Sequence, residues 1–465
     1  MVHLTDPGLA ATTGSGTRQR RCSIKLSLAA CISLAALTAV PLGAGTAGTV
    51  AAQAATQYQY TLVDLGTFGG PQAGQGNAPY INNSGVVVGT ADTATTDPYA
   101  PNDNNAFNGD PYVQHAFLSR GAGLVDLGAL GPEPTDNSSY PAGVNAQGDA
   151  AGLSDNGQFD PLTGTAAVEA VLWAGGKTIA LGTLGGHESQ AFALNNHDQV
   201  AGVAANTVSD PFSMLGWGTQ ARAFLWQHGR MRDLGTLGGP DSFGWFINGS
   251  GQIAGVSYTS ATPNPVTGQP QVDVFLWQHG TMRDLGSLGG SVPVFGGVVA
   301  LNSRGEIVGQ SNLAGDQTAH PFLWNGTRMI DLGTLGGDNG TATAINKAGT
   351  VVGMADLANQ THHGFLWQNG KMHDLPPVDG AACSNASSVN ARGEAVGNAT
   401  NCQGHSLAAV LWRQGVGVDL NALVAPSALH LTDAISINDR GDIIGEGRLP
   451  NGDEHNFLLI PNNHQ

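Results

Sequence analysis

The sequence predicts an all-β protein, a single β-propeller of eight four-stranded blades, and three observations support this fold class. The chain is rich in glycine, with 68 Gly in 465 residues, and only 11% of its residues are charged, against about 25% in typical domains. Three short motifs recur eight times each in the same order, and the two ends of the repeated region hold complementary parts of one unit. Turn-rich, charge-poor chains of this kind are typical of all-β folds.

The first motif is an Asn-x-x-Gly turn ahead of a small apolar strand. An asparagine side chain at the first turn position can bond the backbone two residues on, and glycine accepts a positive φ. The motif therefore predicts one tight hairpin in each unit. The fourth position is glycine in every copy but one, where Asp198 stands, and the copies begin at Asn82, Asn145, Asn195, Asn248, Asn302, Asn346, Asn390 and Asn438.

The spacing of these turns fits one propeller blade. Successive asparagines lie between 44 and 63 residues apart, and the minimum of 44 accommodates four short strands with their turns.

The second motif is an apolar triplet, usually Phe-Leu-Trp, and the third is Asp-Leu, mostly followed by Gly-Thr-Leu-Gly-Gly. A strand that is apolar at every position is covered on both faces, as it is between two neighbouring blades. In one unit the two motifs flank Asn369-Gly370, a dipeptide that favours a tight hairpin. The triplets include Phe117, Trp173, Trp226, Trp277, Trp324, Trp367, Trp412 and Phe457; the Asp-Leu motifs begin at Asp64, Asp126, Asp233, Asp284, Asp331, Asp374 and Asp419, with Ala180 as the exception.

The ends of the repeated region predict ring closure. The chain opens with an Asp-Leu strand, Tyr60 to Phe68, that has no partner before it, and ends with a Phe-Leu-Leu strand, Phe457 to Ile460, that has none after it. Pairing the two completes the eighth blade and removes exposed sheet edges. An open solenoid would instead need capping repeats. Seven blades remain the alternative if one unit is degenerate.

Residues 1–55 are predicted to be a signal peptide and disordered N-terminus, and residues 56–465 the propeller. Basic residues precede the apolar run Leu26 to Val40, and Ala52-Gln53-Ala54 resembles a signal-peptidase site, with cleavage near Ala54. The remainder has 14 Lys and Arg against 34 Asp and Glu, a net charge of −20. This charge argues against nucleic acid and anionic membrane surfaces as partners. We expect a secreted monomer, extracellular or periplasmic, without stable membrane insertion.

Only two cysteines follow the predicted signal. Cys383 and Cys402 lie 19 residues apart around one predicted hairpin, and an oxidising compartment favours a disulfide between them.

Residues that recur in every blade are interpreted as structural, so departures from the repeat are the functional candidates. The longest insert holds Asp97, Asp103 and Asp110, whose carboxylates predict a Ca²⁺ loop, although the spacing matches no EF-hand. No other cofactor is expected. Inserts in the third and fourth units carry Phe212, Trp217 and Tyr258, which we expect to be exposed on one face of variable loops, where binding usually occurs.

His115-Ala116-Phe117 is a literal copy of the triplet that names the HAF-type extracellular repeat family of bacteria. The sequence resembles that family from Asp64 to Leu459. The resemblance implies a secreted repeat protein without catalytic or ligand-binding residues to transfer. The name-giving histidine recurs at His320, His363 and His455 but not in the other units.

The function favoured by these observations is an extracellular binding module whose variable loops contact a glycan or a protein. No nucleophile elbow, zinc-protease helix, P-loop or dinucleotide loop occurs in the right context, so no catalytic residue is predicted. A hydrolase or lyase with an axial site, and a structural envelope component, are the alternatives.

Overall fold

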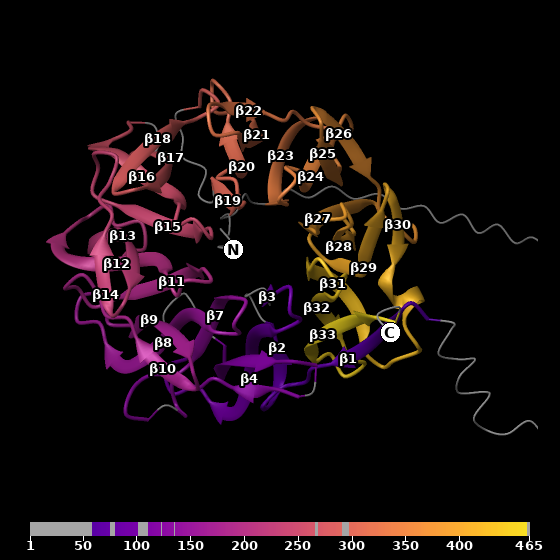
Figure 1. Cartoon of the computed structure of the whole chain (residues 1–465), viewed down its shortest axis with the longest axis horizontal. Coiled ribbons are helices and arrows are strands. Elements are labelled where there is room, and N and C mark those ends of the chain that lie inside the picture. The colour runs from indigo at the N-terminus through magenta and orange to yellow at the C-terminus, as the bar shows by residue number, and fades with distance from the viewer. Residues whose placement is uncertain are drawn as a thin grey trace, which may run out of the picture. The chain divides into compact units, whose positions relative to one another are not determined.

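Eight antiparallel sheets stand around a common axis and form an eight-bladed β-propeller (Figure 1). The computed structural model describes residues 58–74, 80–100, 110–121, 123–133, 135–265, 268–290 and 297–462. The predicted fold class and blade number are confirmed.

Each blade runs from an inner strand beside the axis to an outer strand at the rim. Blade 1 consists of β2 (Gly69–Ala73) and β3 (Tyr80–Ile81) with β4 (Val87–Thr96), β5 (Tyr112–Ser119) and β6 (Val125–Asp126). Blade 2 consists of β7 (Ser139–Val144), β8 (Ala150–Phe159), β9 (Ala166–Ala174) and β10 (Lys177–Ala180), and blade 3 of β11 (Ser189–Leu194), β12 (Val200–Ser209), β13 (Thr219–Gln227) and β14 (Arg230–Asp233). Blade 4 consists of β15 (Ser242–Ile247), β16 (Ile253–Pro263), β17 (Pro270–Gln278) and β18 (Thr281–Gly286).

The second half of the ring has the same strand order. Blade 5 consists of β19 (Val298–Leu301), β20 (Ile307–Asn312), β21 (Ala319–Trp324) and β22 (Met329–Asp331), and blade 6 of β23 (Gly336–Ile345), β24 (Val351–Leu357), β25 (His362–Gln368) and β26 (Lys371–Leu375). Blade 7 consists of β27 (Cys383–Val389), β28 (Ala395–Thr400), β29 (Ser406–Arg413) and β30 (Val416–Asp419), followed by a 3₁₀ turn (Leu420–Leu423). Blade 8 consists of β31 (His430–Ile437), β32 (Ile443–Arg448), β33 (Glu454–Pro461) and β1 (Tyr60–Asp64).

The first strand of the chain closes the ring, as predicted. Strand β1 pairs antiparallel with β33, in a register that places Tyr60 opposite Pro461 and Asp64 opposite Phe457. Tyr60 is buried, and its hydroxyl accepts a hydrogen bond from Arg413 of blade 7 at 3.0 Å. The predicted strand continued to Phe68, but β1 ends at Asp64 because the Asp64 carboxylate accepts the Gly66 N–H and turns the chain.

The strand order gives the propeller two different faces. Because the strands of a blade alternate in direction, the first and third turns of each blade lie on one face, which we call the turn face. The loops between second and third strands and the connections to the next blade lie on the opposite face, which we call the loop face.

The repeated asparagines link neighbouring blades on the turn face. Each is buried, and its side-chain oxygen accepts backbone N–H groups of its own turn, as Asn346 does from Ala348 and Thr350. Its amide then donates to the backbone oxygen of the asparagine in the next blade, at 2.7 to 3.4 Å, in seven of the eight blades. In the remaining blade, Asn145 donates to the Asp198 carboxylate at 3.2 Å. The motif therefore forms both the turn and the inter-blade contact, and this ring of hydrogen bonds is called the asparagine belt below.

Glycines in the second strands allow the blades to be thin at their centres. A Cβ on Gly255 would lie 1.7 Å from the Phe243 carbonyl oxygen of the inner strand and 2.8 Å from the Phe275 ring. Phe275 begins a Phe-Leu-Trp triplet and is fully buried, as are its counterparts in the other blades that carry phenylalanine there. The alternation of glycine and large aromatic side chains thus builds the core.

The predicted disulfide is present. Cys383, at the start of β27, is bonded to Cys402 after β28, with the two Cα atoms 5.2 Å apart. In the part of the chain that the structure describes, no helix has the length and apolar character needed to cross a membrane.

Candidate functional site

The repeated histidine and aspartate form pairs within single blades. Each His Nδ1 lies 2.8 or 2.9 Å from the carboxylate of the Asp-Leu-Gly motif on the neighbouring strand, as His320 does from Asp331. In three of the four pairs the carboxylate also accepts the backbone N–H of the glycine two residues on, as Asp331 does from Gly333 at 2.8 Å. After Asp374 this position is Pro376, which has no N–H. These residues therefore end the outer strand, and the four pairs lie in separate blades.

Blade 2 departs from both motifs and compensates within itself. Ala180 replaces the aspartate, and Glu169 replaces the histidine. The Glu169 carboxylate accepts the Gly182 N–H at 3.0 Å, which is the bond that the missing aspartate would make. This substitution supports the structural interpretation of the repeated acid.

The tryptophans of the triplets pack between blades. Trp173 donates from Nε1 to the Gly128 carbonyl of blade 1 at 3.2 Å, and Trp412 to the Pro376 carbonyl of blade 6 at 3.0 Å. Their indole rings are largely buried, so they do not offer a surface for stacking sugars.

The proposed calcium loop is only partly described. Asp103 lies outside the described residues. Asp97 and Asp110 are both tied to the loop base: Asp97 accepts the Tyr99 N–H at 2.7 Å, and Asp110 accepts the Tyr112 N–H at 2.8 Å and the Gln114 amide at 3.2 Å. Burial raises the pKa of both carboxyl groups. Calcium binding at this loop stays a prediction.

The expected exposure of the aromatic candidates is wrong for two of the three. Trp217 and Tyr258 are only 3% and 2% exposed, and Phe212 is half-buried. The Tyr258 hydroxyl donates to the Phe212 carbonyl at 3.1 Å, because the insert of blade 3 folds down onto blade 4. These side chains hold the loops together beneath the surface.

A different set of apolar side chains is exposed on the loop face, and we call it the apolar tip. Phe159, Leu162 and Val208 are 58%, 58% and 50% exposed. The Phe159 ring meets the Tyr99 ring of blade 1 edge-on at 5.5 Å. Leu162 comes within 4.0 Å of where a Cβ on Gly218 in blade 3 would stand. The tip therefore spans blades 1 to 3.

The sequence contains a signal for this region that the repeat motifs obscured. An Asp-Pro or Asn-Pro dipeptide stands at the start of the loop in blades 1 to 4, at Asp97, Asp160, Asp210 and Asn264. In the first three, the carboxylate accepts a backbone N–H two residues on, which ends the long hairpin in a compact turn.

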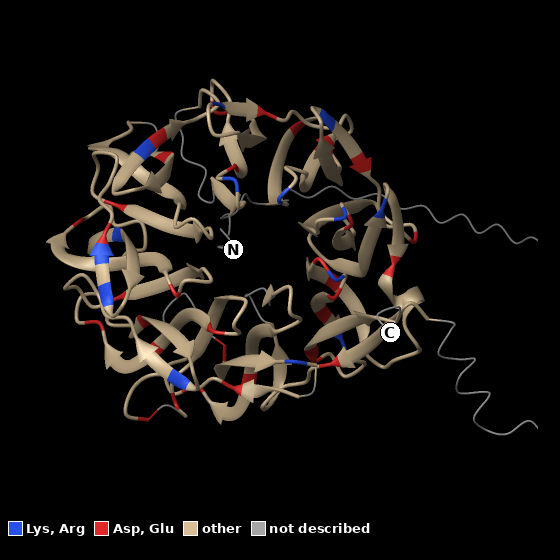
Figure 2. Cartoon of the chain, viewed as in Figure 1, with Lys and Arg blue, Asp and Glu red and all other residues tan. Residues whose placement is uncertain are grey.

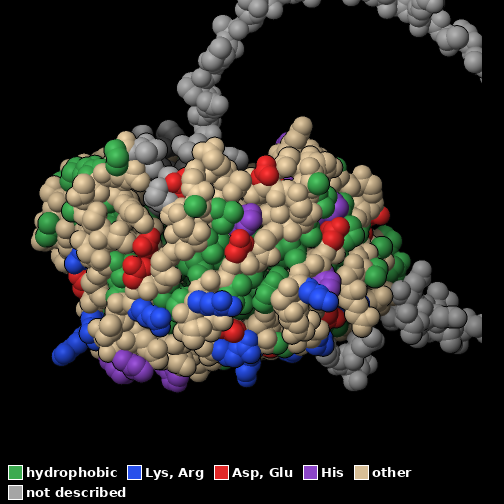
Figure 3. Space-filling view, turned by 90° about the horizontal axis from the view of Figure 1, so that it is seen from above, with side chains coloured by type: hydrophobic (Ala, Val, Ile, Leu, Met, Phe, Trp, Pro, Cys, Tyr) green, Lys and Arg blue, Asp and Glu red, His purple; other side chains and the backbone are tan. Residues whose placement is uncertain are grey.

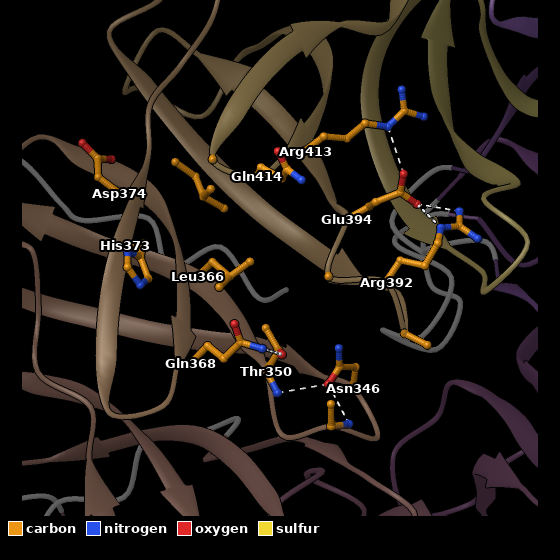
Figure 4. Close-up of a pocket in the computed structure, with 15 residues that line it drawn as sticks. Asn346, Thr350, Leu366, Gln368, His373, Asp374, Arg392, Glu394, Arg413 and Gln414 are labelled. Carbon is orange, nitrogen blue, oxygen red and sulfur yellow. Dashed lines mark hydrogen bonds and ion pairs between the residues drawn. The ribbon is translucent and has the colours of Figure 1, made fainter.

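A pocket of about 860 Å³ lies on the turn face between blades 6 and 7 (Figure 4). Its walls carry Leu366, Gln368 and His373 on one side and Arg392, Glu394 and Arg413 on the other. In blade 7 the residue opposite the triplet tryptophan, Trp412, is Gly417. In blades 3 to 6 the residue at this position is a methionine: Met231, Met282, Met329 and Met372.

The charged groups of this pocket are bonded to one another. Glu394 pairs with Arg392 at 2.5 Å and with Arg413 at 2.9 Å. Burial disfavours its ionised form, but hydrogen bonds from Asn390 and from the two arginines outweigh burial and lower the pKa of Glu394. Glu394 is therefore a fixed anion at neutral pH and a poor proton donor.

The two faces differ in charge. Twelve of the fourteen Lys and Arg residues after residue 57 lie in the turns of the turn face or in the outer strand just before Asp-Leu-Gly: Arg120, Lys177, Arg230, Arg232, Arg283, Arg304, Arg328, Lys347, Lys371, Arg392, Arg413 and Arg440. Figure 2 shows them at the inner turns and along the outer strands. Figure 3 shows that Lys and Arg gather toward one edge of the ring wall, while Asp and Glu lie mostly further from it. The acidic excess thus belongs mainly to the loop face.

No family model and no curated protein matches the chain. Among solved structures, a puromycin-hydrolysing peptidase of Mycobacterium tuberculosis is similar with a TM-score of 0.41 and 10% identity, over 68% of this chain and 50% of the peptidase. A Trypanosoma rangeli sialidase aligns with a TM-score of 0.34 and 12% identity, over 86% of this chain and 57% of the sialidase. The Aleuria aurantia lectin aligns with a TM-score of 0.31 and 11% identity, over 69% of this chain and 95% of the lectin. The chain thus spans about half the length of the peptidase. Similarities this low carry no argument about function.

Proposed function

We propose that this protein is a secreted binding module of the HAF-type repeat kind, and that the loop face of blades 1 to 3 contacts a protein partner. The disulfide between Cys383 and Cys402 supports an oxidising compartment. The rigid ring supports recognition by loops, because loops held on a fixed scaffold present their side chains in a constant arrangement.

The apolar tip carries this proposal. Three large apolar side chains on the adjacent long hairpins of blades 2 and 3 are at least half exposed, and exposed apolar side chains gathered on one face support an interaction site. The buried residues beneath them, including Trp217 and Tyr258, fix the loops that present the tip.

The chemistry of the tip favours a protein over a glycan. Two of its three side chains are aliphatic, and aliphatic groups lack the flat ring face on which sugars stack. Most Lys and Arg residues lie at the turn face or in the outer strands, which leaves the loop face acidic and favours a partner with basic residues around an apolar centre.

Catalysis is the weaker alternative. The pocket between blades 6 and 7 has five ionisable residues in its lining, but Glu394 and its two arginines are tied to each other and Asp374 is paired with His363. A hydrolase needs an acid and a base whose proton-exchanging atoms face the substrate, and this arrangement does not present such a pair.

The test measures binding of the fluorescently labelled protein to intact cells of the producing organism. We expect Phe159→Ser, Leu162→Ser and Val208→Ser combined to weaken binding by at least about tenfold. The matched control is Val416→Ser with Val418→Ser, which alters exposed apolar side chains of blade 7, 66% and 37% exposed, and leaves the tip intact.

Two treatments of the cells identify the partner. Loss of binding after protease treatment supports a protein partner, whereas loss after periodate oxidation alone indicates a glycan and contradicts the proposed partner class. Equal binding by wild type and the triple variant, or no binding by wild type, removes the tip as a binding site.

A further inference from the structure

A row of polar side chains crosses the three inner strands of blade 8. The strand registers place Asp433 opposite Glu446 and Glu446 opposite Asn456. Residues directly opposite on adjacent antiparallel strands project from the same side of the sheet, with Cβ atoms about 5 Å apart. Two carboxylates and one carboxamide therefore stand side by side, and like charges in this arrangement are destabilising.

The positions equivalent to Glu446 and Asn456 are apolar in blades 2 to 4, so the repeat does not require polar residues there. The position of Glu446, eight residues after the belt asparagine, is occupied by Leu153, Val203 and Val256 in blades 2 to 4, and the position of Asn456 by Ala170, Ala223 and Val274. Blade 7 is intermediate, with Asn398 opposite Ala409. Asn398 also donates to the Asp433 carboxylate at 2.8 Å and extends the polar set between the blades.

Several buried polar atoms in and beside this row have no hydrogen-bond partner in the described chain. Asn456 is fully buried, and within the described chain neither its amide nitrogen nor its oxygen has a hydrogen-bond partner. One oxygen of Asp433 and the side-chain oxygen of Asn385 are also buried without a partner there. A buried amide that makes no bond keeps its full desolvation penalty, so such a group calls for a ligand.

The oxygens converge on one point beside blade 1. A Cβ on Gly74 would lie 2.6 Å from the Glu446 carboxylate oxygen and 2.8 Å from the Asn456 side-chain oxygen. Gly74 therefore leaves open the space into which both oxygens point.

No base neutralises the two acids among the residues that the structure describes. The nearest arginine along β32, Arg448, is paired with Glu454 at the strand end. Burial, with the charges of Asp433 and Glu454, raises the pKa of Glu446 to about 8, and burial raises the pKa of Asp433 to about 6. Two buried acids thus stand side by side without a basic partner in the described chain.

We propose that Asp433, Glu446 and Asn456 bind a divalent cation of the Ca²⁺ type between blades 8 and 1. Carboxylate and carboxamide oxygens are the ligands that Ca²⁺ prefers. Only two of the three proposed ligands are acidic. The described chain holds no group of three or more His, Cys, Asp or Glu residues that could hold a metal ion. The cation would link the last blade to the first beside the inner strands. Strand β1 already links the same two blades at the rim.

Isothermal titration of the protein with CaCl₂ and, separately, MgCl₂ tests this site. We expect one Ca²⁺ per chain, weaker Mg²⁺ binding because Mg²⁺ demands octahedral geometry, and release of about one proton per Ca²⁺ at pH 7, read from buffers of different ionisation enthalpy. We expect Glu446→Gln to reduce Ca²⁺ affinity at least about tenfold and to abolish the proton release. Glu133→Gln is the matched control, because it makes the same change at an exposed glutamate outside both candidate calcium sites.

Thermal unfolding gives a second readout that does not depend on calorimetric heats. Ca²⁺ in about 100-fold excess over its Kd should raise the Tm of the wild type by about 4 °C, and this rise should vanish in Glu446→Gln and persist in Glu133→Gln. Glu446→Gln should also raise the Tm measured without Ca²⁺ at pH 8, which shows that the variant is folded. Absence of Ca²⁺ binding by the wild type, or undiminished binding by Glu446→Gln, overturns the proposal.

Discussion

Blades 1 to 4 and blades 5 to 8 are built from the same repeat but are specialised in different places. In the first half the second strands are 10 or 11 residues long and extend beyond the ring on the loop face. In the second half they are 6 or 7 residues long. The second half instead changes its interior, where Asn398 and Glu446 replace the valines of blades 3 and 4.

The difference shows which parts of the repeat are free to vary. The belt asparagine, the core aromatic and the outer-strand cap keep their roles in both halves, because each bonds or packs against a neighbouring strand or blade. Loop length and the inner polar row vary because the ring closes without them. Function is therefore expected in these variable parts, on the surface of the first half and inside the second.

Removing the closing strand should have the largest effect. Deletion of residues 57–67 leaves β33 as an exposed edge and removes the buried Tyr60 from blade 8. We expect the Tm to fall by about 10 °C or more, measured by differential scanning calorimetry. Deletion of Thr163 and Gly164 from an exposed turn of blade 2 is the control and should change the Tm little. A melting temperature unchanged by loss of β1 would contradict the closed ring.

Stability should depend on pH most strongly through Glu446 in the second half of the ring, while the buried Asp241 and Asp92 of the first half act in the same direction at lower pH. The pKa of Glu446 is about 8 in the folded chain against 4.5 without burial, so between these values the folded state holds a proton that the unfolded state has lost. The free energy of unfolding should therefore fall by about 3–5 kcal/mol as pH rises from about 4.5 to about 8, and level off above. Asp433, with a pKa of about 6, acts in the same direction at lower pH.

Urea unfolding at a series of pH values measures this dependence. Glu446→Gln should reduce this dependence, because the amide does not titrate. The part due to Asp433, Asp241 and Asp92 should remain. Val203→Ile, at the equivalent position of blade 3, should leave the slope intact. An unchanged slope in Glu446→Gln would show that other groups determine the pH dependence.

The asparagine belt should matter in both halves but unequally. Asn346→Ala removes three hydrogen bonds, to Asn390, Ala348 and Thr350, and should lower the free energy of unfolding by about 2–3 kcal/mol. Asn145→Ala loses the same two turn bonds, from Gln147 and Asp149. It should cost less only because its amide bonds to the carboxylates of Asp198 and Asp149 are long, at 3.2 and 3.4 Å. Equal losses in chemical denaturation would indicate that the turn, and not the inter-blade bond, sets the contribution of this residue.

The smallest expected effect tests the compensation in blade 2. Glu169→Ala frees the Gly182 N–H and should cost about 1 kcal/mol. Adding Ala180→Asp should restore the loss, since an aspartate there caps the same turn in the other blades. A double variant no more stable than Glu169→Ala alone would mean that the two positions are independent.

Repetition made the architecture predictable. The Asn-x-x-Gly turns, the apolar triplets and the unpaired end strands are local patterns, and eight copies in one order leave few ways to bury both faces of every strand. The disulfide followed from the only two cysteines in the region. The functional candidates were harder to predict, because exposure depends on how a loop folds back: Trp217 and Tyr258 look like surface residues in an insert, yet the insert packs down over them.

The sequence by itself determined the strand order, the number of blades and the closing pair, because these depend on hydrogen-bonding and apolar patterns that each unit carries internally. Only the tertiary structure decided which charges share a face, which loop side chains reach solvent, and that Asp433, Glu446 and Asn456 stand in one row beside Gly74. The physical reason is that these relations join residues on different strands and in different blades, whose separation is set by sheet register and ring curvature.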